Sequence, residues 1–359
     1  MDRPAPGDPP RPSRRLRAWA ARLPGVALTA PEVTVVIPTK DRWDLLSRCA
    51  LPSVRAQAGV DLEVVVVDDG SSDGTAERLA ALDNDRLRVL RNERPRGQPA
   101  ARNAGAEVAG GRWLAFLDDD DLWSPDKLRV QLDRASATGA LWAYGRAVVV
   151  DSSLRVIEDD PFPAPQELAS LLLHGNWIPG GGSNVVVRAD AFSRVGGFDE
   201  SLRLVEDWDL WLRLLGVGAP ASCDEVVMAR MEHGSNSMVR DWAEVKVVVE
   251  RMMSKYRLVT DADRRGVAEW LALEQHRAGR RLSAARMYLS IALHHRSPGN
   301  LPIAAGALFG APGLELASRL LVKTRGSSHV EAYRTAARHE PGWLDLYRHG
   351  PSANEPAHG

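Results

Sequence analysis

Short runs of apolar, mostly β-branched residues alternate with helical patterns through the first half of this 359-residue chain. Strand-like runs lie at 33–37, 63–67, 88–90 and 113–117, and helical patterns fill 44–57, 75–82, 99–108 and 125–138. Strands that are apolar on both faces and separated by helices form parallel sheets that helices cover on both sides. The sequence therefore predicts an α/β fold around a mostly parallel sheet. Pro52 predicts a kink or break within the first helix.

Polar residues follow three of these strands at the point where each strand ends. Thr39 and Asp41 come after the first strand, Asp68 and Asp69 close the second, and an acidic run at 118–121 follows the fourth. In open α/β sheets, ligands bind outside the carboxyl ends of the strands. The pattern therefore predicts that these polar groups border a binding site.

The acidic run consists of Asp118, Asp119, Asp120 and Asp121. Adjacent carboxylates repel one another, which raises their pKa values and costs stability unless something compensates. A hard divalent cation such as Mg²⁺ or Mn²⁺ compensates them, because it prefers carboxylate oxygen. Side chains alternate in an extended chain, so we expect Asp118 and Asp120 to point the same way and share one cation. The alternative is a solvated acidic loop that caps the helix beginning near Pro125.

Six segments, taken together, resemble the successive motifs of family 2 glycosyltransferases. They are VVIPTKDR at 35–42, VVDDGSSD at 66–73, ARNAG at 101–105, the acidic run, GGFDE at 196–200 and EDWDLWLR at 206–213. Their order and spacing cover about residues 33–240. The resemblance implies a GT-A-type, Rossmann-like fold with helices on both faces of the sheet. It also implies transfer of a sugar from a nucleotide-diphosphate donor with inversion.

The resemblance also implies roles at individual positions. Asp207 matches the general base, and Asp120 matches the ligand of a Mn²⁺ or Mg²⁺ ion that bridges the diphosphate; His233 is a second candidate ligand. Donor-binding positions are Pro38, Thr39, Asp41, Asp69, Arg102, Asn103, Asp118 and Asp119. Candidate contacts to the diphosphate or the acceptor are Glu206, Arg230 and Gly182. The acidic run has one carboxylate more than the usual Asp-x-Asp pattern, so Asp118, Asp119 and Asp120 all remain candidate ligands.

Within the donor set, the resemblance implies that Asp69 accepts a hydrogen bond from the base, which is uracil or thymine in relatives. The expected donor is therefore a UDP- or dTDP-sugar. Arg102 and Asn103 are expected near the base and ribose, and Asp118 near the ribose or the sugar.

Most of these motifs have a structural alternative. Residues 68–71 suit a strand-ending turn, and Arg102 with Asn103 suits an exposed helix face. Glu206 and Asp207 suit the first turn of a helix, where acids complement the helix dipole. The glycines at 180–182, which precede a strand at 185–187, suit either a plain turn or a border of the acceptor cleft.

Other function classes fit less well. A dinucleotide-dependent oxidoreductase needs a Gly-rich turn after the opening strand, and residues 38–43 contain no glycine. A nucleotidyltransferase would usually have a Gly-rich, basic loop there. The remaining alternative is a catalytically inactive protein of the same fold that binds a sugar nucleotide or a glycan, because a fold does not guarantee activity. We expect a metal-assisted single displacement in polysaccharide, cell-envelope glycan or glycoconjugate biosynthesis.

The pattern along the chain predicts four parts. Residues 1–30 are a basic, Pro-rich tail expected to be disordered, or to have weak affinity for anionic lipid. Residues 31–240 form the catalytic domain, with a nucleotide-binding half at 31–125 and an acceptor half at 126–240. A helical region at 241–349 and a disordered tail at 350–359 follow. The helical region is expected to be an ordinary appendage, a peripheral membrane contact or a homodimer interface.

Composition excludes some partners. The net charge of −1 provides no basic field that would attract nucleic acid. Two cysteines, Cys49 and Cys223, make neither a disulfide framework nor a zinc cluster, which fits a reducing compartment. No segment reaches the roughly 18 apolar residues of a membrane span. The expected location is the cytoplasm, including the inner face of the membrane, and the Arg-, Ala- and Gly-rich composition suggests a bacterial source. The expected acceptor is a glycan, a lipid-linked carrier or a small molecule.

Overall fold

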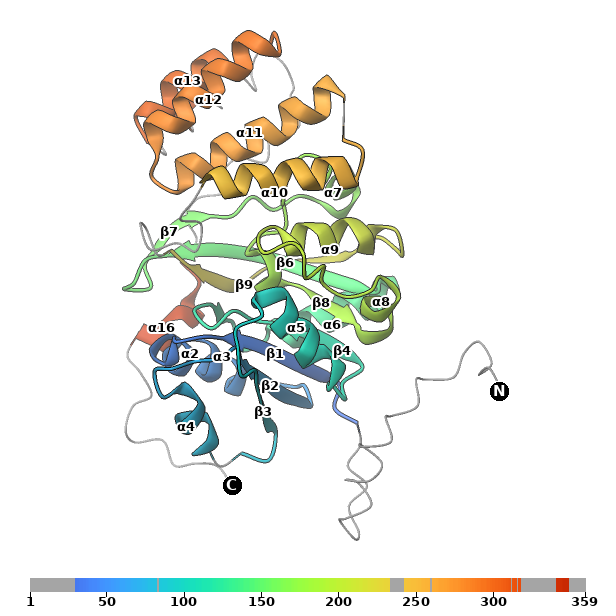
Figure 1. The fold of residues 1–359 in the computed structure, drawn as a ribbon. Helices are drawn as coiled ribbons and strands as arrows, with labels where there is room; N and C mark the ends of the chain where they lie inside the picture. The colour runs from blue at the N-terminus through green and yellow to red at the C-terminus, as the bar shows by residue number, and fades with distance from the viewer. Residues whose placement is uncertain are drawn as a thin grey trace, which may run out of the picture. The chain divides into compact units, whose positions relative to one another are not determined.

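The computed structural model describes residues 30–82, 84–232, 242–258, 260–310, 312–314, 316–317 and 340–348. These residues fold around one central sheet (Figure 1). Its strands are β1 (Val33–Thr39), β2 (Leu62–Asp68), β3 (Leu87–Arg91), β4 (Trp113–Phe116), β5 (Leu122–Trp123), β6 (Trp142–Val150), β7 (Val156–Asp159), β8 (Val186–Arg188) and β9 (Ala221–Met231). Apart from Ala30, the predicted tails lie outside the described residues, as does the candidate ligand His233.

The strands follow the order β3-β2-β1-β4-β8-β6-β9-β5, and β7 pairs with β6. Strands β3, β2, β1 and β4 are mutually parallel, as predicted, and β6 pairs with β9 in parallel. Strand β8 runs antiparallel between β4 and β6, and β5 and β7 are also antiparallel to their neighbours. The predicted α/β class is confirmed, and the second half of the chain adds antiparallel strands to the sheet.

Side chains of the central strands alternate between two hydrophobic cores because successive residues of a strand face opposite sides. Val36 and Phe116 belong to the core on one face, and Val35 and Ile37 to the core on the other. The first core is covered by α5 (Gln98–Glu107), α7 (Pro165–Leu171), α8 (Ala189–Arg194) and α9 (Glu206–Leu215). The second is covered by α2 (Trp43–Arg48), α3 (Ala50–Arg55), α4 (Thr75–Ala80) and α6 (Lys127–Thr138).

The helix predicted at 44–57 is two helices, α2 and α3. The helix is interrupted at Cys49, between them, rather than at Pro52. Pro52 lies in the first turn of α3. The backbone N–H groups of a first helical turn have no partner inside the helix, so the missing N–H of proline costs nothing there. Pro52 therefore starts a helix instead of kinking one.

The predicted helical region contains α10 (Trp242–Lys255), α11 (Asp261–Arg277), α12 (Arg281–His294) and α13 (Asn300–Leu308). Its buried residues belong to the same hydrophobic core as α9, and the rings of Trp208 on α9 and Trp270 on α11 lie 5.2 Å apart. A short segment further on contains η3 (Gly342–Leu344) and α16 (Asp345–Arg348). Among the described residues, no helix is long and apolar enough to cross a membrane.

Gly105 determines how closely α5 approaches the sheet. A Cβ atom at this position would lie 2.3 Å from Val36 Cγ1 and 3.2 Å from Val67 Cγ2. Those two valines are side chains of β1 and β2. The glycine of the ARNAG motif therefore lets the helix that carries Arg102 and Asn103 pack directly on the two central strands.

We predict that Gly105→Ala lowers the free energy of unfolding by about 1–3 kcal/mol, because an added methyl group overpacks the contact between helix and sheet. Urea denaturation measures the change. Gly342→Ala is the matched control, since a Cβ there meets no atom within 4 Å and the backbone is not left-handed. Equal stability of the two variants would contradict the prediction.

Candidate active site

The three polar clusters predicted at the strand ends lie together. Asp41 donates its backbone N–H to Ser71 Oγ, and its carboxylate accepts from the backbone N–H of Ser72 at 2.6 Å. Arg42 forms ion pairs with Asp119, at 3.1 Å, and with Asp120. The loops after β1, β2 and β4 are thereby tied to one another, as the carboxyl ends of neighbouring parallel strands should be.

Burial alternates along the acidic run. The side chains of Asp118 and Asp120 are 27% and 13% exposed. Asp119 and Asp121 are buried: Asp119 accepts a hydrogen bond from Thr39 Oγ1 at 2.7 Å, and Asp121 accepts one from the backbone N–H of Met231. Burial raises the pKa of Asp119 to about 7. The run is not extended, because Asp119 and Asp120 form a turn in which the backbone N–H of Asp121 donates to the carbonyl oxygen of Asp118. That Asp118 and Asp120 share one cation stays a prediction.

Thr39 and Pro38 are buried at the end of β1, and Thr39 contacts the acidic run through its hydrogen bond to Asp119. Asp41 is exposed and has a positive φ of 53°. Asp residues tolerate this left-handed conformation better than most others. Of the predicted positions on this loop, Asp41 is the one exposed to solvent.

Arg102, a buried residue of α5, connects the acidic run to α9. Its Nη2 donates to Asp118 Oδ1 at 2.6 Å, and its Nη1 donates to Glu206 Oε1 at 2.7 Å. The guanidinium also lies over the ring of Phe198, 5.2 Å from its centre. The exposed helix face considered for Arg102 is therefore wrong, because the side chain points inward and bridges two acidic groups.

The first turn of α9 carries Glu206 and Asp207. Asp207 Oδ2 accepts from Asn176 Nδ2 at 2.8 Å, and Oδ1 accepts from the backbone N–H of Trp208. Burial raises the pKa of Asp207, and the positive charge of Arg102 opposes part of that rise. Burial likewise raises the pKa of Glu206, to about 7. Both carboxyl groups therefore bind protons more tightly than exposed acids do.

The predicted glycine turn lies against these acids as η1 (Gly181–Asn184). A Cβ at Gly181 would come within 2.7 Å of Asp207 Oδ2, and one at Gly182 within 3.0 Å of Arg102 Nη2. Gly181 also has a φ of 55°. Glycine therefore lets this turn approach the carboxylate and the guanidinium closely, which a plain surface turn would not require.

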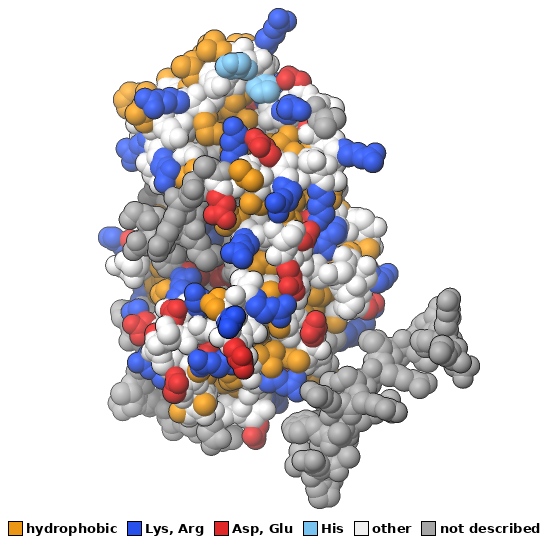
Figure 2. Space-filling view, viewed as in Figure 1, with side chains coloured by type: hydrophobic (Ala, Val, Ile, Leu, Met, Phe, Trp, Pro, Cys, Tyr) orange, Lys and Arg blue, Asp and Glu red, His pale blue; other side chains and the backbone are white. Residues whose placement is uncertain are grey.

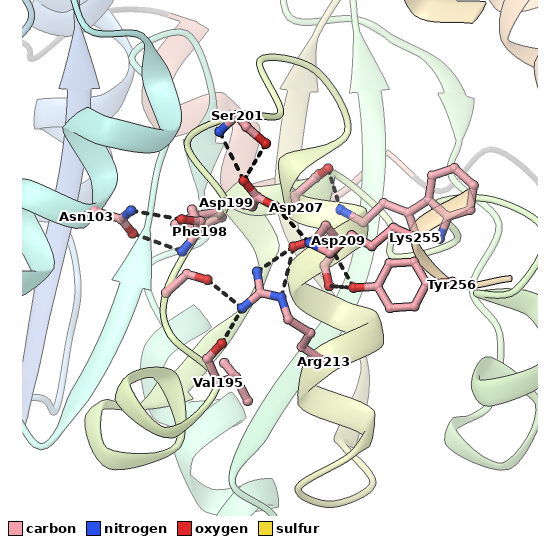
Figure 3. A network of polar contacts seen from close by, with 12 residues as sticks. Asn103, Val195, Phe198, Asp199, Ser201, Asp207, Asp209, Arg213, Lys255 and Tyr256 are labelled. Atoms are coloured by element: carbon pink, nitrogen blue, oxygen red, sulfur yellow. Dashed lines mark hydrogen bonds and ion pairs between the residues drawn. The ribbon is translucent and has the colours of Figure 1, made fainter. Parts of the chain in front are cut away.

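A network beneath the site holds α9 in place, and sequence reasoning missed it (Figure 3). Asp209, fully buried, binds Arg213 within the helix and accepts from Lys255 Nζ and the Tyr256 hydroxyl at 2.6 and 2.7 Å. Lys255 also reaches Asp199, at 2.8 Å. The i, i+4 spacing of Asp209 and Arg213 was readable in the sequence. The contacts of Asp209 with Lys255 and Tyr256 could not be predicted from local sequence, because those residues lie more than 40 positions further along the chain.

Two predicted donor contacts have other partners in this structure. The carboxylate of Asp69 accepts from Asn92 Nδ2 and from the backbone N–H groups of Arg96 and Gly97. Asn103 exchanges two hydrogen bonds with the backbone of Phe198, each 2.9 Å long (Figure 3). Asp69 thus orders the loop that precedes α5, and Asn103 holds the GGFDE segment. Contact of either residue with a base or ribose stays a prediction.

A pocket of about 150 Å³ opens beside the candidate base. Its wall includes Asn176 and Gly181, which both adjoin Asp207 Oδ2, and Arg230 of β9. Helix α11 contributes the opposite side with Trp270, Leu273, Glu274 and Arg277. Arg230 lies 4.0 Å from Asp160 Oδ2 in this wall. The pocket therefore combines aromatic, charged and backbone groups next to the half-buried carboxylate of Asp207.

Among the described residues, the candidate metal ligands lie in the acidic run. Among the described residues, no group of three or more His, Cys, Asp or Glu side chains is arranged to hold a metal ion. Asp118 and Asp120 are the accessible members of the run, and Mg²⁺ sites often use only one or two carboxylates with substrate phosphates completing the shell. The donor set therefore fits a cation that binds together with a diphosphate.

Comparisons with known proteins find a matching family model and several relatives of this chain. A family model described as "Glycosyl transferase family 2" matches residues 34–196. The chain is 33% identical over 274 residues to "Succinoglycan biosynthesis protein ExoO" of Rhizobium meliloti (strain 1021), and the match covers 72% of this chain and 76% of that protein. It is 26% identical over 232 residues to an Escherichia coli protein, "UDP-Glc:alpha-D-GlcNAc-diphosphoundecaprenol beta-1,3-glucosyltransferase WfgD", covering 62% and 88%.

Among solved structures, S. aureus TarS 1-349 in complex with UDP-GlcNAc matches with a TM-score of 0.50 at 16% identity, covering 89% of this chain and 92% of that chain. The fold is therefore of the GT-A type, as the sequence motifs implied. The chain belongs to glycosyltransferase family 2.

The raised pKa of Glu206 predicts a pH-dependent stability. A carboxyl group that binds its proton more tightly in the folded state stabilises folding at low pH, and this contribution is lost as pH rises through the folded pKa. The window runs from the ordinary value of 4.5 to about 7. We therefore expect Glu206→Gln to gain stability relative to wild type as pH rises through this range, measured by urea denaturation with EDTA present. Glu77→Gln, an exposed position on α4, is the control; a pH-independent difference for Glu206→Gln would contradict the prediction.

Proposed function

We propose that this protein transfers a sugar from a UDP- or dTDP-sugar to an acceptor hydroxyl, with inversion, in one metal-assisted displacement. The observation that carries the proposal is the bridge through Arg102, which joins Asp118 of the acidic run to the turn that holds Asp207. A donor site and a base must be held at a fixed separation for an in-line reaction, because catalysis depends on the orientation of the reacting groups. A buried, doubly paired guanidinium provides such a spacer.

On the donor side, Asp118 and Asp120 are the residues that would hold Mn²⁺ or Mg²⁺. Such a cation, when bound, stabilises negative charge on the diphosphate as a Lewis acid. Arg102 is shared among Asp118, Glu206 and the nearby Asp207, so one positive charge faces three carboxyl groups. That deficit of positive charge supports a site that binds a cation together with its nucleotide.

On the acceptor side, Asp207 accepts the proton of the attacking hydroxyl. As the acceptor oxygen bonds to the anomeric carbon, the bond from that carbon to the diphosphate oxygen breaks on the opposite face. The amide of Asn176 orients the Asp207 carboxylate, and the pocket beside it accommodates the acceptor. The raised pKa suits this role, since a general base works best when its pKa approaches the working pH.

The relatives suggest the biological setting. One is named for succinoglycan biosynthesis, and the other for glucosyl transfer to a sugar on diphosphoundecaprenol. We accordingly place this protein in the biosynthesis of a polysaccharide or cell-envelope glycan, with a glycan or lipid-linked acceptor. The competing proposal is a protein of the same fold that binds the sugar nucleotide without turning it over. Donor hydrolysis or transfer in the presence of Mn²⁺ would exclude this alternative.

We predict that Asp207→Asn reduces sugar transfer by about 10²- to 10⁴-fold, because it removes the group that accepts the proton. Binding of UDP with Mn²⁺ should persist, since an amide at 207 retains an oxygen that can accept from Asn176. Turnover with a UDP-sugar and calorimetric UDP binding measure the two effects. Asp224→Asn, at an exposed position on β9, should behave as wild type. A variant at 207 that turns over normally would refute the assignment of the base.

A second prediction concerns the cation. At about a hundredfold excess over its Kd, UDP with Mn²⁺ should stabilise the wild-type protein by about 2.7 kcal/mol. Asp120→Asn should lose most of this gain, because it removes one candidate ligand and the ion pair with Arg42. Thermal unfolding with UDP alone, Mn²⁺ alone and both together separates the contributions. Unchanged Mn²⁺ dependence in Asp120→Asn would remove Asp120 from the ligand set.

A further inference from the structure

Two neighbouring helices of the C-terminal region, α12 and α13, each expose an apolar face. On α12 the exposed positions include Leu282, Leu289 and Leu293, and on α13 they include Leu301 and Leu308, with Phe309 at its end. These six side chains are between 45% and 75% exposed. The two helices pack against each other, and Figure 2 shows hydrophobic and basic side chains mixed at the top of the view, where Figure 1 places both helices.

The spacing assigns these side chains to continuous faces. Positions 282, 289 and 293 recur at i, i+7 and i+11, which lie on one side of an α-helix, and 301, 308 and 309 recur at i, i+7 and i+8. The opposite sides are buried, with Ala284 and Ile291 on α12 and Ile303 on α13. Helix α13 contains no charged residue. Both helices therefore bury one apolar face and expose another.

Helices α12 and α13 themselves carry charges of one sign, although the acids Asp261 and Glu269 of α11 contact His295 and Asn300 at their ends. From Ala278 to Leu314 the sequence has no Asp or Glu, and it has four arginines, Arg280, Arg281, Arg286 and Arg296. Arg286 is exposed and lies one turn after Leu282, within the apolar face of α12. Exposed leucines combined with arginines and no acids are the composition of helices that lie in a membrane interface and bind anionic lipid.

We propose that the exposed faces of α12 and α13 dock this protein on the surface of a bilayer that contains anionic phospholipid. The leucines and Phe309 insert among the headgroups, and the arginines contact lipid phosphates. This is peripheral binding, since no described helix crosses a membrane.

A second copy of the chain fits this surface less well. In a twofold interface each patch meets its own copy. Arg286, which lies within the apolar face, would then approach the Arg286 of the second copy, with no acid in residues 278–314 to offset the two charges. Buried unpaired charges are strongly destabilising. An anionic lipid surface supplies the missing negative charge without any complementary patch on the protein.

Sedimentation of the full chain with vesicles tests the proposal. The protein should sediment with vesicles of equal parts phosphatidylglycerol and phosphatidylcholine, remain in solution with phosphatidylcholine alone, and be released by salt. The double variant Leu289→Glu/Leu293→Glu should weaken binding by roughly tenfold or more. Arg286→Gln should weaken it by about fivefold, the effect of one basic side chain near an anionic surface.

Val247→Glu is the matched control. Val247 is 58% exposed, as Leu282 is, but it lies on α10 near Glu244 and Glu250, outside the proposed surface. It should bind vesicles as wild type does, and binding of UDP with Mn²⁺ should be equal in all variants if their folds are intact. Wild-type protein that stays in solution with anionic vesicles, or α12 variants that sediment as wild type does, would overturn the proposal. So would a dimer in light scattering that Leu289→Glu/Leu293→Glu converts to a monomer.

Discussion

The pairing of Arg102 with Asp118 and Glu206 is the contact on which the candidate active site depends. A buried guanidinium is tolerated only when acidic groups surround it, and removing one partner leaves a costly uncompensated charge. Here the two partners come from the loop after β4 and from the start of α9, which are far apart in the sequence. The electrostatic requirement of one side chain therefore holds the acidic run and the candidate base Asp207 in a common site.

The helices of the C-terminal region pack on α9 and form part of the candidate active site. Lys255 and Tyr256 bind the buried Asp209 from outside α9, and Trp270 packs on Trp208 of the same helix. Helix α11, which carries Trp270, also forms one side of the pocket beside Asp207. The next two helices carry the proposed lipid-binding surface. A lipid-linked acceptor, if this is the substrate, would thus meet a pocket and a docking surface built by adjacent helices of one region.

Residues inside the family motifs divide into those that face the site and those that hold its walls. Asp118, Asp120 and Asp41 remain accessible, as a ligand site requires. Asp69 and Asn103 also occupy motif positions, but their side chains form hydrogen bonds with the backbone of neighbouring loops. Such loops contain backbone polar groups that need hydrogen-bond partners when they are buried. Membership of a motif does not show whether a residue binds a ligand or holds a loop, because both roles require a polar side chain at the end of a strand or helix.

The sequence by itself determined the sheet and the location of the site. Runs such as 113–117 are apolar at every position, so they are strands buried on both faces, and the polar residues after such strands had to meet at one edge. Only the tertiary structure decided which acids are paired. Glu206, which pairs with Arg102, and Lys255, which pairs with Asp209, come from distant segments, and burial of Asp119 follows from the packing of three loops. Local patterns carry information on period and turns, whereas the pairing and dielectric surroundings of a charge depend on contacts that exist only after folding.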